Sequence, residues 1–321
     1  MEKLFVAQRI GERYGALLGG MAMRNVKNAN YVQINNDKTI IKQLEGVEIL
    51  RAIDAWNRYK WTRKHFDEKP RNGYFIWAKK TGIVPLTTCA AIEKKGVIQK
   101  MNNLIVIEKG VKARAIGNCF SIGKRLKSRH EGKGKIIIKE GASLSVEHLH
   151  LWGENDELVM NYEFVLGKNA RLEYKYRCLK PGREMKIKTR AILGENASAE
   201  LLVITRAKKL ESSEEILLKG KNSKGTVKIR IVGEKDSIVR ARTLIDAQNE
   251  GKGHLDCQGL IVEKNASIEL IPVLKNSCRK AILTHEASIG AINDEELAYL
   301  MSRGIAKKNA IKLIVNGFLK S

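Results

Sequence analysis

The sequence has few aromatic residues and few prolines, and it lacks any long hydrophobic run. Aromatic residues make up 6% of the 321 residues and there are four prolines, which excludes a proline-rich linker protein. Charges interrupt every apolar stretch within a few residues, so none is long enough to cross a bilayer. The N-terminal stretch MEKLFVAQRIGERYGALLGG carries charges throughout, unlike a secretory signal.

Cysteine is also scarce, and the common catalytic motifs are missing. Five cysteines without close spacing are typical of free thiols in a reducing compartment. The sequence contains no GxxxxGK[ST] loop, no GxSxG elbow, no HExxH motif and no paired CxxC. These absences argue against the corresponding nucleotide hydrolases, esterases and zinc proteins. We therefore expect a cytoplasmic protein without such catalytic machinery.

Basic side chains are what the sequence has in excess. The 59 Lys and Arg residues outnumber the 35 Asp and Glu residues, for a formal net charge of +24. A basic surface attracts nucleic acids and other polyanions. Here the charge is spread along the chain, and basic positions often alternate with apolar ones, as on the solvent side of strands. Nucleic acid is therefore the less favoured partner, and a membrane partner is not expected.

Residues 1–98 are expected to form a mostly helical region. In the segment GVEILRAIDAWNRYKWTRKHFDE, apolar residues recur near helical spacing, and Pro70 follows its end. Three aromatic residues among its charges, Trp56, Tyr59 and Trp61, suit either a packed core or a surface on which bases stack. Helical spacing favours the core.

Residues 99–285 repeat a pattern in which two alternating apolar stretches flank a turn, as in LIVIEKGVKARAI and EFVLGKNARLEYK. Most of these turns follow one another at intervals of about 27 to 31 residues. Such a period predicts a stacked β-solenoid, with a β-sandwich as the alternative. The turn residues, of types that tolerate positive φ, are Gly110, Gly141, Asn169, Asn196, Asp236 and Asn265, with a further candidate at Gly225.

Residues 286–321 return to helical spacing. Asn293 and Glu296, three residues apart, form a capping-box start, and Gly304 is placed to end the helix. A second helix is expected over AKKNAIKLIVN, up to Gly317. The apolar side chains of the two helices either dock on the solenoid as a cap or meet a partner.

The period also predicts which polar residues stack on neighbouring coils, about 4.8 Å apart. Cys257 lies one period before His285, with Glu286 beside it, and a thiolate, an imidazole and a carboxylate together suit a thiophilic metal. Cys119 and Cys257 are about five periods apart, or roughly 24 Å along the axis. A slip of register would undo these assignments. A second series at about one period consists of Cys119, His148 and Cys178.

The remaining histidine and cysteine candidates are weaker. His148 and His150 lie two residues apart on one face of a strand, where they either hold a metal or point outward. Cys89 and Cys278 are expected to be buried thiols that pack as small hydrophobic residues.

The C-terminal third resembles a known family. Two segments are similar in residue types and spacing to the SufB/SufD family of the SUF iron–sulfur assembly system. They are GHLDCQGLIVEKNASIELIPVLK and LTHEASIGAINDEELAYLMSRGIAKKNAIKLIVNGFL. The resemblance is strongest over residues 254–318 and extends from about residue 100. It implies a mainly β protein, with a right-handed parallel β-helix core between an N-terminal α-rich region and a C-terminal helical segment.

The resemblance also implies site residues. Cys257 matches the cysteine of the family's cluster site, and His285 and Glu286 match its His-Glu pair. Cys119 matches the internal sulfur-accepting cysteine, although AIGNCFS lacks the family's neighbouring Glu and Ala-Pro. We expect nearby Lys and Arg side chains to give this thiol its thiolate character. A family Gln-x-Trp motif linked to sulfur passage corresponds to His150 and Trp152.

The implied role is that of an assembly scaffold rather than an enzyme. Its cargo is a transient iron–sulfur cluster, and the involvement of a flavin stays open. The implied partners are a SufC-type ABC ATPase, bound through the C-terminal helices, and a second β-helix in a homodimer or a SufB–SufD heterodimer. Retention of Cys257 favours a SufB-like subunit. The alternatives are a SufD-like structural partner without its own cluster and a basic solenoid that binds polyanions.

Overall fold

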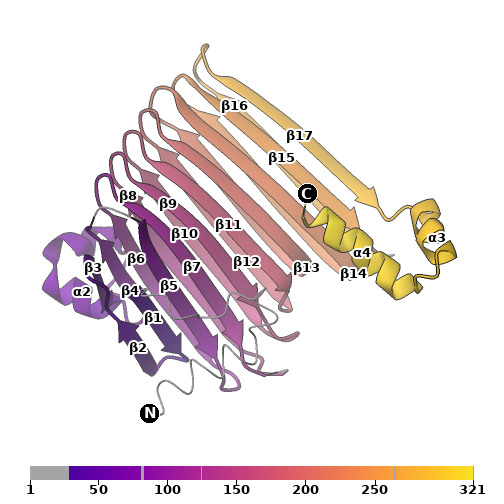
Figure 1. Ribbon diagram of the computed structural model, residues 1–321, viewed down its shortest axis with the longest axis horizontal. Coiled ribbons are helices and arrows are strands. Elements are labelled where there is room, and N and C mark those ends of the chain that lie inside the picture. The colour runs from indigo at the N-terminus through magenta and orange to yellow at the C-terminus, as the bar shows by residue number, and fades with distance from the viewer. Residues whose placement is uncertain (1–28, 81–82, 124, 264, 321) are drawn as a thin grey trace.

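The computed structural model describes residues 29–80, 83–123, 125–263 and 265–320. These residues form a β-solenoid of about seven turns with short helices at its sides (Figure 1). The chain winds between two stacked faces, because most strands pair in parallel with the strand that follows one full coil later. The solenoid expected from the sequence period is thus confirmed, and the sandwich alternative is wrong.

The two faces are called A and B. Face A stacks the second halves of two long strands, β13 (Ser198–Leu218) and β14 (Ser223–Ala247), with β4 (Tyr74–Ala78), β6 (Ile98–Ile107), β8 (Arg129–Ile138), β10 (Glu157–Leu166), β12 (Glu184–Leu193) and β16 (Ser267–Asn276). Face B stacks their first halves with β1 (Ala29–Ile34), β5 (Ile83–Ile92), β7 (Lys112–Ser121), β9 (Ser143–Leu151), β11 (Arg171–Lys180), β15 (Gly251–Ile261) and β17 (Ile282–Ala291).

Turn residues in the left-handed conformation define one edge of the solenoid. Asn169 and Asn196 have φ values of 56° and 53°, and the backbone N–H of Asn196 donates to the carbonyl of Lys221 in the next coil at 2.8 Å. The proposed turn at Gly225 is wrong, since the left-handed residue of that coil is Asn222, with φ 56°. The other expected turn residues, Gly110, Gly141, Asp236 and Asn265, also have positive φ.

Side chains that alternate along each strand fill the space between the faces. In β12 the sequence EMKIKTRAIL buries every second residue, as expected for a strand with one face in a core. One continuous cluster of buried residues runs from Ala29 to Cys257. Each large apolar side chain buried in this way contributes about 1.5–3 kcal/mol. The interior is therefore a continuous packed column along the axis.

The N-terminal region differs from the expectation. Where residues 1–98 are described, they form mostly strands rather than helices; residues 1–28 lie outside the described part. Besides strands of the two faces, they contain β2 (Lys38–Lys42) and β3 (Val47–Arg51), both antiparallel to their partners. The helical elements are one short helix, α2 (Ala52–Arg58), and one 3₁₀ helix, η1 (Lys60–His65).

Long-range strand pairing explains this difference. Val47 and Ile49 point inward from β3, which pairs with β4, so cross-strand packing overrides the local helical spacing. The aromatic residues of α2 and η1 pack together, as the core interpretation required. The ring of Trp61 lies 5.1 Å from that of Trp77, and the ring of Tyr59 lies 5.7 Å from it.

Two helices follow the last strand. Because β17 continues to Ala291, helical structure begins at α3 (Asp294–Ser302) rather than at residue 286, and α4 (Lys307–Phe318) follows. Asn293 caps α3 by accepting the backbone N–H of Glu295 at 2.8 Å, and Gly304 has φ 82° beyond its end.

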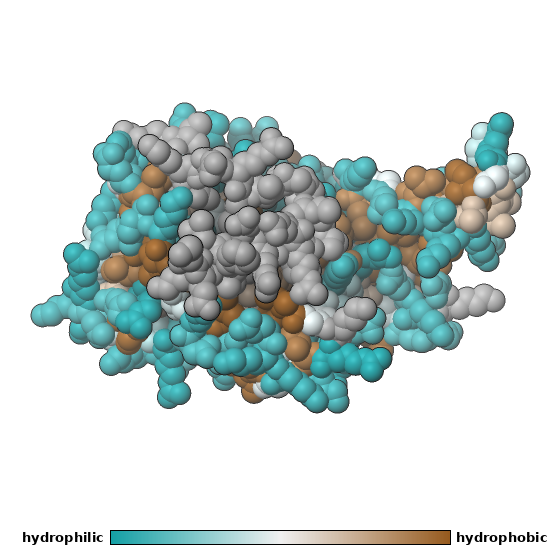
Figure 2. Space-filling model, turned by 60° about the horizontal axis from the view of Figure 1, so that its bottom comes forward, coloured by the Kyte–Doolittle hydropathy of each residue, from teal (hydrophilic) through white to brown (hydrophobic). Residues whose placement is uncertain are grey.

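One helix is docked and the other is exposed. Val315 of α4 packs in a cluster with Val232 and Leu260 of face B, whereas α3 has no buried residue. Tyr299 of α3 and Leu313 of α4 are 58% and 53% exposed. Figure 2 shows a mostly hydrophilic surface with several hydrophobic patches, one of which lies toward the right-hand end, where Figure 1 places the two helices.

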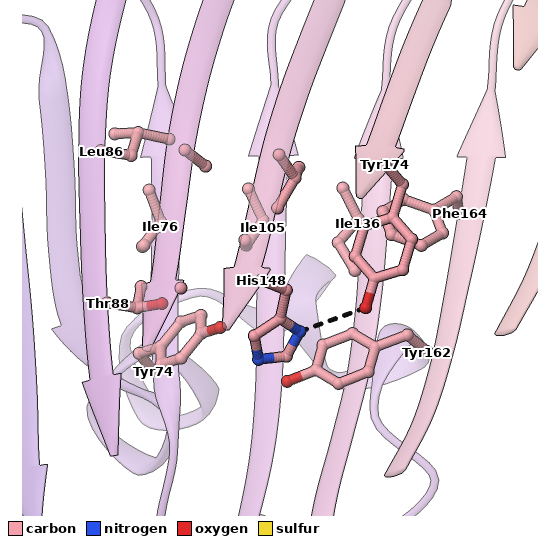
Figure 3. A pocket seen from close by; sticks show the side chains of 13 residues that line it. Tyr74, Ile76, Leu86, Thr88, Ile105, Ile136, His148, Tyr162, Phe164 and Tyr174 are labelled. Carbon is pink, nitrogen blue, oxygen red and sulfur yellow. Dashed lines mark hydrogen bonds between the residues drawn. The ribbon is translucent and has the colours of Figure 1, made fainter. Parts of the chain in front are cut away.

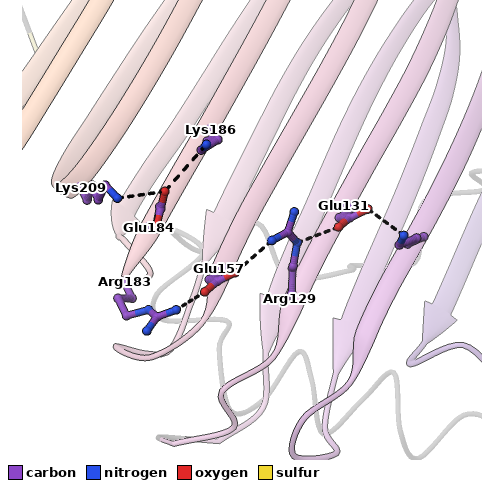
Figure 4. Close-up of polar contacts among 8 residues, drawn as sticks. Arg129, Glu131, Glu157, Arg183, Glu184, Lys186 and Lys209 are labelled. Atoms are coloured by element: carbon purple, nitrogen blue, oxygen red, sulfur yellow. Dashed lines mark hydrogen bonds and ion pairs between the residues drawn. The ribbon is translucent and has the colours of Figure 1, made fainter.

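The outer surface carries ladders of charges between coils (Figure 4). Arg129 lies 2.7 Å from Glu131 and 3.2 Å from Glu157, and Lys209 lies 3.2 Å from Glu184. Exposed ion pairs of this kind contribute at most about 1 kcal/mol each to folding stability. They also neutralise basic side chains that would otherwise be available to bind a polyanion. Within the described residues, no helix combines the length and apolarity needed to span a membrane.

A candidate metal and sulfur site inside the solenoid

One thiol and two imidazoles meet in the interior of face B. Cys119 comes from β7, and His148 and His150 come from the adjacent β9. Their donor atoms all lie within 4.8 Å of one another. The Nε2 atom of His148 is 3.5 Å from the Sγ atom of Cys119 and 2.9 Å from the Nε2 atom of His150. All three residues are buried, so the group faces the interior rather than solvent.

Two tyrosines of the next coil hold the imidazoles from behind. The hydroxyl of Tyr174 lies 3.1 Å from Nδ1 of His148, and that of Tyr176 lies 3.3 Å from Nδ1 of His150. Figure 3 shows His148 and Tyr174 joined by this hydrogen bond beside Tyr162. A cavity of about 30 Å³ lies beside His148 and is lined also by Tyr74, Tyr162 and Tyr174. The Nε2 atoms are thereby left facing one another and the thiol.

A third histidine extends the polar group. The Nδ1 atom of His130 lies 2.8 Å from the amide oxygen of Gln99. The His130 ring stacks on Trp152, with the ring centroids 5.2 Å apart. The indole Nε1 of Trp152 is buried and finds no hydrogen-bond partner among the described residues. The structure brings His150 and Trp152, the two residues that the resemblance relates to sulfur passage, close together, with ring centroids 5.7 Å apart.

Burial keeps this group neutral. It lowers the pKa of His148 to about 4 and that of His130 to about 3, because a desolvated imidazolium is unfavourable. Burial also raises the pKa of the Cys119 thiol well above its ordinary value. The expectation that nearby Lys and Arg would give Cys119 thiolate character is therefore wrong, since its neighbours are neutral.

The register of the coils differs from the expected one by two residues. Cys119 pairs with His150, which pairs with Cys178, whereas His148 stands opposite Gly117. A Cβ atom at Gly117 would lie 3.0 Å from the His148 ring, so the absence of a side chain there leaves room for the imidazole. His148 reaches Cys119 diagonally rather than directly.

The second candidate set lies at the other end of the interior. Cys257 of β15 is buried, and its Sγ atom lies 3.3 Å from Oγ1 of Thr243. Its register partner in β17 is Ala287, whereas His285 pairs with Leu255. Burial is the largest cause of a raised pKa at the Cys257 thiol. The predicted stacking of Cys257 on His285 is therefore also two residues out of register.

Glu286 points away from Cys257. Its carboxylate lies 3.4 Å from Nε2 of His254, whose Nδ1 lies 2.8 Å from Oγ1 of Thr284. The Glu286 side chain is 73% exposed. Within one chain, the structure places Cys257, His285 and Glu286 on adjacent strands without gathering them at one point.

A buried carboxyl near Cys257 is the residue that the sequence analysis missed. Glu214 of β13 is fully buried and stands in register between Thr189 and Thr243. Its Oε2 accepts a hydrogen bond from Ser212 at 3.3 Å, while its Oε1 has no hydrogen-bond partner in the part of the chain that the structure describes. Burial raises its pKa to about 8. The alternation in ESSEEILL carried the signal, since a glutamate there falls at an inward position.

The remaining cysteines separate into buried and partly exposed thiols. Cys89 is buried, as expected, whereas Cys278 lies at a turn and is only partly buried, so the expectation for Cys278 is wrong. Cys178 is buried with its Sγ atom 3.7 Å from the sulfur of Met185. It stacks under His150 without joining the group at Cys119.

Comparison with known proteins identifies the family. Residues 90–318 match the family model described as the SUF system FeS cluster assembly, SufBD core domain. An iron–sulfur cluster assembly SufBD family protein of Archaeoglobus fulgidus is 27% identical over 92% of this chain and 86% of its own length. Its counterpart in Pyrococcus horikoshii is 32% identical over 73% of each chain. These matches, together with the fold, show that the chain belongs to the SufBD family of iron–sulfur cluster assembly proteins.

Proposed function

We propose that this protein is a scaffold subunit on which an iron–sulfur cluster is built before transfer to an acceptor protein. The observation that carries this proposal is the position of two inward-facing thiols, Cys119 and Cys257, in the solenoid of a SufBD family member. Successive strand pairings lead from β7 through β9, β11, β13 and β14 to β15. The thiols are therefore five coils apart, roughly 24 Å along the axis.

The first step assigned to the chain is acceptance of sulfur. Cys119 would take the outer sulfur of a donor persulfide: a new S–S bond forms at Cys119 as the S–S bond of the donor breaks, and the donor leaves as a thiol that carries away the Cys119 proton. His150 and Trp152 would lie along the path of this sulfur. Polar interior residues of face A then lead toward Cys257. They stand in continuous register as Tyr162, Thr189, Glu214 and Thr243, the last in contact with the Cys257 thiol. On face B, the polar series in register with Cys119 ends at Ile231, after His150, Cys178 and Thr205. The residues in register before Cys257 on that face are the apolar Val203 and Ile229, so the polar route to Cys257 lies along face A.

The second step is cluster assembly where two subunits meet. Within the described residues, β16 and β17 each pair with one neighbouring strand only, and β17 is largely exposed. An edge of this kind accepts strands from another chain. A second copy or a SufD-like partner would bring the exposed His285 and Glu286 into one site with Cys257. Mixed sulfur, nitrogen and oxygen ligands hold iron less firmly than four thiolates, which suits release of the cluster.

The third element is an ATPase partner at the C-terminal helices. Tyr299 of α3 and Leu313 of α4 expose apolar surface beside the docked Val315. A SufC-type ATPase bound there would act directly on the end of the solenoid, because α3 follows β17 after a short connection.

Anaerobic reconstitution with ferrous iron and sulfide tests the scaffold assignment. The wild-type protein is expected to become coloured and to retain iron and sulfide through gel filtration. The double variant Cys257→Ala, His285→Ala is expected to lose this cargo, while Cys278→Ala, which removes a partly exposed thiol, keeps it. A cluster yield in the double variant equal to that of wild type would refute the ligand assignment.

A SufD-like structural subunit is the second candidate function. The observation that favours it is the two-residue offset between Cys257 and His285, together with the burial of Cys257. It predicts a protein that stays colourless after reconstitution alone and binds the ATPase equally well with Cys257→Ala.

A further inference from the structure

We propose that Cys119, His148 and His150 form a binding site for one divalent metal ion of the zinc class inside the solenoid. This site goes beyond the scaffold function, which places its cluster at Cys257. It rests on the convergence of three donor atoms from β7 and β9 in a buried space. One thiolate and two imidazole nitrogens are a ligand set typical of tetrahedral zinc.

The distances between the donor atoms fit a tetrahedral ion closely. Bonds of about 2.0 Å to nitrogen and 2.3 Å to sulfur place two ligand nitrogens about 3.3 Å apart and a sulfur and a nitrogen about 3.6 Å apart. The corresponding distances are 2.9 Å between the Nε2 atoms of His148 and His150, and 3.5 Å from Cys119 Sγ to Nε2 of His148. The two imidazoles need to separate by only a few tenths of an ångström.

The hydrogen bonds behind the imidazoles orient them for metal binding. With Tyr174 and Tyr176 at their Nδ1 atoms, His148 and His150 can both carry a proton on Nδ1 and donate it to a tyrosine oxygen. Two unprotonated Nε2 atoms would then face each other at 2.9 Å, and a cation between them would replace their mutual repulsion with two bonds. Such outer hydrogen bonds characterise metal-ligating histidines. The Cys119 thiol gives up its proton as the ion binds.

Space for a further ligand lies beside His148, the one of the three proposed ligands that lines a cavity. The cavity of about 30 Å³ that this histidine lines is large enough for a water molecule. Three protein ligands with one open position are the arrangement of reactive zinc sites rather than closed structural ones. An ion held here could therefore take a small fourth ligand such as water or sulfide.

Metal loading of the full-length protein tests the proposal. The protein is produced in medium supplemented with Zn²⁺ or Co²⁺, passed through gel filtration, and analysed for metal content and for thiolate-to-cobalt charge-transfer absorption. Wild type is expected to hold about one ion per chain, with that absorption band in the cobalt form. Cys119→Ser is expected to lose the band and to retain at least about tenfold less metal than wild type.

Three further variants separate this site from folding and from the cluster. Tyr174→Phe keeps all three ligands and is expected to weaken metal affinity roughly 10- to 100-fold. Cys89→Ser removes another buried thiol and is expected to keep the ion. Cys257→Ser is expected to keep this ion while losing the reconstituted cluster, so failure of one proposal does not imply failure of the other. Metal-free wild-type protein, or an unchanged cobalt band in Cys119→Ser, would overturn the proposal.

Discussion

The buried carboxyl of Glu214 makes the stability of this protein depend on pH in a direction that can be calculated. Burial raises the pKa of this residue from its ordinary value of 4.5 to about 8. The folded protein therefore keeps a proton on Glu214 at neutral pH, whereas the unfolded chain releases it. Stability is lost as pH rises from 4.5 through 8, because the folded state binds more protons than the unfolded state over that interval.

The size of the effect follows from the displacement of the pKa. Each pKa unit corresponds to about 1.4 kcal/mol. At pH 7 the solution is about 2.5 units above the ordinary pKa, so folding with a protonated Glu214 costs about 3 kcal/mol at that pH. Glu214→Gln has the same shape and no titrating proton. We expect the variant to be about 3 kcal/mol more stable than wild type at pH 7, and to gain little at pH 4.5.

Urea denaturation of both proteins at a series of pH values between 4.5 and 8.5 measures this difference. The matched control is Glu211→Gln, on the same strand, whose side chain is 70% exposed. Its stability is expected to change by less than about 0.5 kcal/mol at every pH. If Glu214→Gln and wild type show parallel pH profiles, Glu214 is ionised in the folded protein and the calculation is wrong.

Three other outcomes follow from the fold and the proposed contacts. Asn222→Ala is expected to lower the free energy of unfolding by about 1 kcal/mol relative to Asn222→Gly, because φ is 56° there; equal stabilities by urea denaturation would contradict this. Light scattering should show that Ile289→Lys on the β17 edge disrupts the proposed dimer, whereas Ile98→Lys, at a similarly exposed position, leaves it intact. Leu313→Asp should abolish capture of a SufC-type ATPase and Lys308→Ala should not, so full capture by Leu313→Asp would remove the helices from that interface.

The sequence was sufficient to predict the repeat, because the repeat depends on local chemistry. Residues such as Asn169 and Asn196 tolerate positive φ, and alternating apolar residues between such turns predict two strands in each coil. The length of individual coils was harder to predict. Asp236 and Asn265 also have positive φ, but they lie at the opposite edge of the solenoid, between strands of face B and face A. Counting both edges as one series obscured the turn at Asn222.

The same variation in coil length decides how much of the site could be predicted. Cys119 was paired with His148 instead of His150, an error of two residues. A shift of two residues preserves the side of the strand on which a side chain lies. Cys119 and His148 therefore lie on the same inward side, although the direct partner of Cys119 is His150. Glu286 lies on the other side of its strand from His285, so no register could bring both to the same face.

Residues 47–65 show where local spacing fails to predict the structure. Their local spacing resembled a helix, but pairing of β3 with β4 determined the structure of the first five residues. Local sequence carries no information about that partner, which lies more than twenty residues away in the chain. A helix and a strand at residues 47–51 both allow the aromatic side chains that follow to pack together, and in the structure Trp61 packs against Trp77.

Tracing one sulfur atom tests the scaffold function most directly. The protein is incubated anaerobically with a low-molecular-weight persulfide donor, digested, and analysed by mass spectrometry for one added sulfur atom on each cysteine peptide. The account predicts sulfur on both Cys119 and Cys257 in wild type, on Cys119 alone in Cys257→Ser, and on neither peptide in Cys119→Ser. Sulfur on Cys257 in the Cys119→Ser variant, at the wild-type level, would contradict the account.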